Sequence, residues 1–84
     1  MDSAGCRDFF LGLTQQQISS GALSVAADML AIAAGFDALV QVGSQDPHPS
    51  AFDERLWPII DLELIAAGHR PVFKGQASPP APPP

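Results

Sequence analysis

The residues best suited to chemistry in this chain lie in one short stretch. These are Asp46, His48, Asp53 and Glu54. Carboxylates together with an imidazole are possible ligands for a divalent ion, but none of the spacings here matches a known structural or catalytic site. Acids at the start of a helix ordinarily cap it. We therefore expect no metal site and no cofactor, and Asp46 and His48 are the weak candidates for a ligand pair.

The remaining reactive side chains do not form a catalytic set either. Cys6 is the single cysteine, so an internal disulfide is excluded, and Arg7 is its only basic neighbour in the sequence. We expect it to be a free thiol in a frayed terminus. Asp61 and Glu63 are two residues apart, so on a helix they do not share a face, and we expect both to be solvated. His69 is expected to interact with the last carbonyls of a helix. The sequence thus predicts a protein that is not an enzyme.

Composition excludes further classes of function. Nine acidic against four basic residues give the 84-residue chain a formal charge of −5. Binding to nucleic acid needs clustered lysine and arginine, and an anionic membrane surface attracts the same residues. The N-terminus begins with an acid and lacks a basic segment followed by an apolar run, as a secretory signal would have. We expect a cytoplasmic protein that binds no nucleic acid.

These side chains must be positioned by helices. Thr14 followed by Gln17 has the pattern of a capping box, so the sequence predicts a helix over residues 15–34. Apolar residues recur along it with the three-and-four spacing of a buried face. The stripe includes Val25, Met29, Ile32 and Phe36. A face this wide is normally covered on most sides, which a chain of this length can hardly do alone.

A break in that helix is expected near Gly35. Asp28 and Asp37 are nine residues apart, which places them on opposite faces of a continuous helix. One of the two would then be buried without a partner, at a cost of several kcal/mol. The sequence Ala-Ala-Gly-Phe offers a C-terminal cap at Gly35 instead. Residues 36–42 then fit either a short strand or another helical turn.

The second half predicts a loop, a helix and a tail. The loop covers residues 43–50, and a helix runs from Ser50 or Asp53 to Ala67, where Gly68 ends it. Pro58 either kinks this helix or starts a new one. We divide the chain into a lead-in (1–13), a single small helical domain (14–74) and a disordered proline-rich tail (75–84).

The predicted fold is therefore mainly α, a small helical hairpin that hides its apolar stripe against other protein. The predicted function is a non-enzymatic, acidic protein-binding module: an accessory subunit, regulator or inhibitor of a larger protein, or a homodimer. Aromatic side chains dominate interface energies, so two aromatic anchors join the helical stripe. The expected binding residues are Val25, Met29, Ile32, Phe36, Phe52 and Trp57.

Two alternatives remain open. In a small α/β fold with strands at 36–42 and 71–74, the 44–50 loop would lie where ligands bind, making a ligand-binding or enzyme subunit that uses Asp46 and His48. The run over residues 21–43 is also long enough to span a bilayer, although Asp28 and Asp37 oppose insertion. A membrane-associated subunit is the third class.

Overall fold

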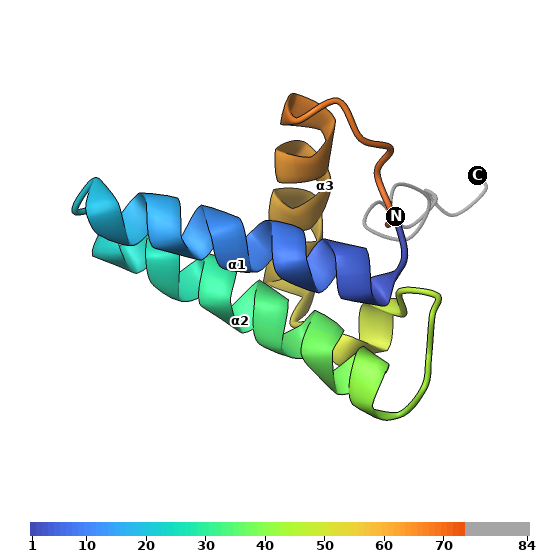
Figure 1. Ribbon diagram of the computed structural model, residues 1–84. Helices are drawn as coiled ribbons and strands as arrows, with labels where there is room; N and C mark the ends of the chain where they lie inside the picture. Colours follow the sequence, from blue (N-terminus) through green and yellow to red (C-terminus); the bar gives the residue numbers. More distant parts are fainter. Residues whose placement is uncertain (74–84) are drawn as a thin grey trace, which may run out of the picture.

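The computed structural model of the chain describes residues 1–73. Its elements are α1 (Ser3–Ser19), α2 (Leu23–Gln41), the 3-10 turns η1 (Pro49–Ala51) and η2 (Glu54–Leu56), and α3 (Trp57–Ala66). Helices α1 and α2 form a long antiparallel hairpin, and α3 stands across it (Figure 1). The prediction of a mainly helical protein is confirmed. The strand alternative is wrong, because 36–41 lies within α2 and residues 71–73 form no strand.

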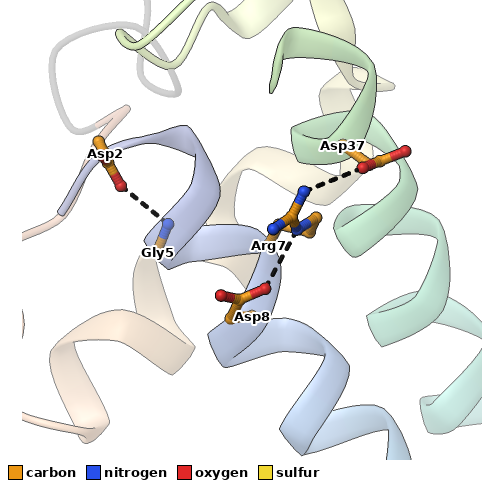
Figure 2. A network of polar contacts seen from close by, with 5 residues as sticks. All are labelled: Asp2, Gly5, Arg7, Asp8 and Asp37. Atoms are coloured by element: carbon orange, nitrogen blue, oxygen red, sulfur yellow. Dashed lines mark hydrogen bonds and ion pairs between the residues drawn. The ribbon is translucent and has the colours of Figure 1, made fainter. Parts of the chain in front are cut away.

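Helix α1 replaces the predicted lead-in. Asp2 caps it, and its carboxylate accepts a hydrogen bond from the Gly5 amide at 2.8 Å (Figure 2). The buried residues of α1 are Ser3, Cys6, Phe10 and Thr14. This spacing of three and four is a helical stripe, and the packing of Phe10 on Phe36 of α2 stabilises the helix.

Thr14 is not an N-cap, so that prediction is wrong. It lies inside α1, where its hydroxyl donates to the Phe10 carbonyl at 2.8 Å. A threonine hydroxyl can satisfy itself on the preceding turn as well as on a helix start. Tertiary burial of the stripe decides between the two, and sequence spacing does not show that burial.

All three α-helices end in the same way. The residue after each C-cap is a glycine in the left-handed conformation: Gly21 (φ 81°), Gly43 (φ 76°) and Gly68 (φ 84°). The next amide then reaches back to a carbonyl five residues earlier, at 2.9 Å, 2.9 Å and 2.8 Å respectively, as in the Schellman motif. The prediction that Gly68 ends a helix is confirmed. The turn at Gly21 is what makes the hairpin.

Gly35 does not break a helix, and the predicted break is wrong. Helix α2 runs through it, and a Cβ built at Gly35 would lie 2.7 Å from Cδ1 and 3.1 Å from Cζ of Phe52. The glycine therefore lets the Phe52 ring pack on the α2 backbone. The carboxylates that argued for a break are both partnered: Asp37 with Arg7 at 3.2 Å, and Asp28 with Arg55 at 3.9 Å.

The core is built from aromatic rings drawn from every part of the described chain. Phe10 stacks on Phe36 with ring centroids 5.9 Å apart, and Phe36 contacts Phe52 at 4.8 Å. Phe52 contacts Phe73 at 5.4 Å. Ile60 and Leu64 of α3 close the other side. The large phenylalanine side chains fill the space between α3 and the hairpin that it crosses.

Residues 49–66 form two 3-10 turns and then α3, which decides between the two roles predicted for Pro58. A single kinked helix from Ser50 or Asp53 is wrong, because η1 and η2 precede a separate α3. Pro58 lies in the first turn of α3, which confirms the alternative of a helix start. The predicted tail, 75–84, lies outside the described residues.

The segment after α3, residues 69–73, turns back along the molecule and is called the strap here. Asp61 holds it: one carboxylate oxygen accepts from the Val72 amide at 2.8 Å and from the Phe73 amide at 3.0 Å. Asp61 is buried, so the prediction that it is solvated is wrong. His69 meets the expectation of contact with the helix end through its amide, which donates to Leu64, and its ring lies edge-on to Phe9.

Candidate protein-binding site

Four of the six expected binding residues lie inside the fold. Met29, Ile32, Phe36 and Phe52 are each less than a tenth exposed and belong to the core. The chain covers this stripe itself, mainly with Phe10 of α1 and with the residues after α2. A binding role for these four residues stays a prediction, and in this fold their side chains are not accessible to a partner.

The other two are more accessible. Val25 is 42% exposed and lies in the half of the hairpin beyond α3. Trp57 is half-buried against the core, and its indole Nε1 donates to the Pro49 carbonyl at 3.0 Å. That bond ties η1 to the start of α3. Trp57 therefore has a structural role that sequence patterning did not indicate.

The weak metal candidates do not converge with other ligands. Asp46 and His48 are exposed on the loop after α2, and Asp53 caps η2 by accepting from the Arg55 amide at 3.1 Å. In residues 1–73 no group of three or more histidine, cysteine or acidic side chains could hold a metal ion. The expected capping role of Asp53 is confirmed.

Cys6 is fully buried, so the prediction of a thiol in a frayed terminus is wrong. Burial raises the pKa of the thiol; the nearby N-terminal ammonium lowers it, and Asp2 adds a small increase. The thiolate is the reactive form. Burial therefore limits the reactivity of Cys6 by blocking access to its sulfur and by favouring the protonated thiol. It packs as a small apolar residue.

An apolar line on the outside of α2 is left uncovered. Its members, named here the α2 seam, are Leu23, Ala27, Leu30 and Ala34. They follow the four-three-four spacing of a heptad, and Leu23 and Leu30 are 66% and 52% exposed. Large and small side chains alternate along the seam. Such a line is typical of a helix surface that packs on another helix.

Beside the seam lies a groove between α1 and α2 with a volume of about 470 Å³. Its apolar lining residues are Leu11, Leu30, Ala33 and Ala34. Ala33 is almost completely buried and forms the floor, while Leu11 and Leu30 are 40% and 52% exposed. The two alanines keep the groove open because they do not reach across it.

Three charged residues also line this groove: Arg7, Asp8 and Asp37. Figure 2 shows how their side chains pair. Arg7 of α1 makes two ion pairs, through Nε to Asp8 at 3.1 Å and through Nη1 to Asp37 of α2 at 3.2 Å. The hydrogen bonds to Asp8 and then Asp37 raise the pKa of Arg7 further. These three residues, the groove rim, link the two helices across 30 positions of sequence.

A second, smaller cavity of about 260 Å³ lies where α1 begins and α2 ends. Its lining includes Ser3, whose amide and hydroxyl both donate to the Gln45 carbonyl, at 3.0 Å and 3.1 Å. Those donors are satisfied within the chain. Ser3 is therefore not free to bind a ligand in this cavity.

Helix α2 is the one helix in residues 1–73 that is long and apolar enough to cross a membrane, with a hydropathy of 1.8. Length and composition alone make this weak support, since core helices of other proteins pass the same test. Only 33% of its apolar window is buried in the fold. Large apolar side chains of this helix, such as Leu23 and Leu30, thus remain exposed.

No family model, curated protein or solved structure matches this chain. Its chemistry is therefore read from its own surface. The groove and its rim were missed at the level of sequence. The seam was visible as a heptad spacing, but Arg7 and Asp37 are brought together only by the hairpin.

Proposed function

We propose that this chain is a small, acidic, non-enzymatic binding module that holds a helix of a larger protein along the α2 seam and the adjoining groove. It would act as an accessory subunit, a regulator or an inhibitor. The observation that carries the proposal is the uncovered α2 seam, which borders an apolar groove in a fold whose core is otherwise closed.

The size and shape of this surface support a helical ligand. From Leu23 to Ala34 the seam covers twelve residues, about 16 Å or three helical turns. Alanines at alternate seam positions let a second helix approach closely, and the exposed leucines lie on either side of them. Helix-in-groove recognition uses this arrangement of apolar anchors.

The polar side chains support a non-enzymatic role. Asp2 and Asp53 cap helical segments, and Asp61 binds the strap. Arg7 pairs with its neighbours, and the thiol of Cys6 is buried. Each of these side chains has a structural task in the fold, including Asp2 and Arg7, which also line cavities. A lone reduced thiol also supports the proposed cytoplasmic location.

Site-specific photo-crosslinking in the native cell tests this function. A photoreactive residue replaces Leu30 in the groove or, as matched control, Leu62 on α3, which is also exposed (52% and 66%). We expect a discrete protein adduct from position 30 and none from position 62. Equal adducts from both positions, or none from position 30, would refute the proposal.

The mass of the adduct separates the remaining alternatives. An adduct of twice the chain mass identifies a homodimer across the seam. The seam would then still be the binding surface, but a larger protein as its partner would be refuted. Adducts with lipid alone, together with co-flotation of the protein with liposomes, identify the membrane-associated class and overturn the proposal.

A further inference from the structure

The groove rim carries an excess of negative charge that faces outward. Arg7 is the one cation in it and is 26% exposed, while the carboxylate side chains of Asp8 and Asp37 are 67% and 46% exposed. Both nitrogen atoms of Arg7 that make ion pairs point at these acids (Figure 2). Among the residues that the structure describes, a ligand in the groove therefore meets two carboxylates and one arginine that is already paired.

The rim stands at a fixed distance from the apolar part of the site. Asp37 follows Leu30 by seven residues, which is two helical turns, about 10 Å, on nearly the same face. Any helix that docks along the seam has the same rise of about 1.5 Å per residue, so its residues can be matched to those of α2. Its apolar residues lie over Leu30 and Ala34, and the residue two turns away from the Leu30 contact lies beside the rim.

The α1–α2 hairpin of a second copy does not supply the matching charge. Arg7 is the only basic residue in α1 and α2, and it is already paired. Two seams packed in parallel would set one acidic rim against another. Packed antiparallel, they would set the rim against Leu23 and Ile18, which carry no charge. In neither arrangement does the partner's hairpin place a cation beside the exposed carboxylates of Asp8 and Asp37.

We propose that the occupant of the groove is an amphipathic helix of a different protein that carries a lysine or arginine two turns from its central apolar residue. The inference rests on the proposed function and adds the partner's chemistry to it. The cation lies beside Asp8 and Asp37, where it fixes the register and direction of the docked helix. Charge complementarity of this kind contributes mainly specificity and association rate.

Two designed helical peptides and the full chain provide the test. Both peptides carry leucine and alanine at alternating heptad positions; one has lysine seven residues from the central leucine and the other has glutamate there. We expect the lysine peptide to bind roughly fivefold more tightly or better, and the preference to shrink as salt rises from 0.05 to 0.5 M. Fluorescence anisotropy gives both affinities.

Variants of the rim provide the reciprocal measurement. In Asp8→Lys or Asp37→Lys the preference is expected to reverse toward the glutamate peptide. Asp8→Lys is the safer variant, because Asp8 is the more exposed acid and Arg7 keeps Asp37. Glu63→Lys on α3 serves as a control for net charge and should leave the preference unchanged.

The outcomes distinguish failure of the basic partner from failure of the helix-binding function. If both peptides bind equally at low salt and Leu30→Glu abolishes both, the helix-binding function stands and the basic partner is refuted. If neither peptide binds at 100 µM (on the order of the weakest useful affinity), the inference and the helix-binding function fail together. A wild-type dimer that Leu30→Glu dissociates in sedimentation refutes the foreign partner.

Discussion

The two halves of the α1–α2 hairpin share one backbone pattern but differ in how they are held. In the base, residues 3–14 and 29–41, each helix buries a full stripe, which includes Cys6, Phe10, Ile32 and Phe36. In the tip, residues 15–28, Ala26 is the only buried residue. The base is covered by α3, the 3-10 turns and the strap. The tip extends beyond them (Figure 1).

The two halves show that in this molecule a segment can be helical without being covered by the rest of the chain. The tip is as helical as the base, and the Schellman turn at Gly21 closes it. Its stability is that of two paired helices with small side chains, whereas the base has an aromatic core. The base buries the aromatic core that fixes how the elements pack, and the uncovered seam begins in the tip, which buries a single residue.

The largest expected effect contrasts one core residue with one tip residue. Phe36→Ala removes a fully buried ring that contacts two other rings, and it should lower the free energy of unfolding by about 3–5 kcal/mol. Ile18→Ala, at a side chain 54% exposed, should change it by less than about 0.5 kcal/mol. Urea unfolding followed by circular dichroism measures both. Similar losses would show that the tip is part of the core.

The next effect concerns the strap that covers the base. Asp61→Ala leaves the Val72 and Phe73 amides without their acceptor, and it should destabilise the fold by about 2–4 kcal/mol. Asp61→Asn retains a side-chain oxygen and should lose less than half as much. Trp57 lies near Phe73, with ring centroids 6.4 Å apart, so its fluorescence follows the release of the strap. Wild-type stability in Asp61→Ala would show that the strap is held by Phe73 alone.

Two glycines give effects of opposite sign. Gly35→Ala forces a methyl group into the Phe52 ring, and this overpacking exceeds the gain in helix propensity, for a net loss of about 1–2 kcal/mol. Gly12→Ala in α1 meets nothing within 4 Å and should gain about 0.5–1 kcal/mol. Thermal unfolding of the two variants provides the comparison. A gain at both positions would mean that Phe52 does not pack on α2.

The smallest effect appears only in alkali. Because burial raises the pKa of the Cys6 thiol above its ordinary value of 9.0, the folded chain keeps a proton that the unfolded chain loses. The thiol therefore leaves stability unchanged well below its ordinary pKa, and stability falls as the pH rises through that value. Unfolding free energies between pH 7 and pH 10.5 (roughly two units around the usual thiol range) should slope downward in the wild type. Cys6→Ala should lack that part of the slope, and an identical slope in both proteins would refute the assignment.

The sequence predicted the elements that depend on neighbours and failed where distant residues decide. The helical class, the inward Met29–Ile32–Phe36 stripe and the helix end at Gly68 followed from periodicity and turn chemistry. The Ala-Ala-Gly motif occurs at both Gly35 and Gly68, yet only the second ends a helix. The difference at Gly35 is Phe52, a residue 17 positions later, and no local rule contains it.

The candidate site divides along the same line. The stripe was assigned to a partner because one helix of this length needs cover, and the predicted lead-in proved to be a helix that supplies it. The seam that remains exposed is the outer face of the same helix. Its rim pairs Arg7 with Asp37, a contact that depends on where the hairpin turns. Moving that turn from Gly35 to Gly21 changes which residues face solvent.

The position of Phe73 in the core has a consequence for how the chain is made. Its ring packs on Phe52 and lies beside Trp57, so the aromatic core is complete only after residue 73 has been synthesised. Until then the nascent hairpin presents Phe10, Phe36 and Phe52 with one side uncovered. The base therefore cannot complete its aromatic core before residue 73 is available, and until then the exposed rings make the growing chain prone to aggregation.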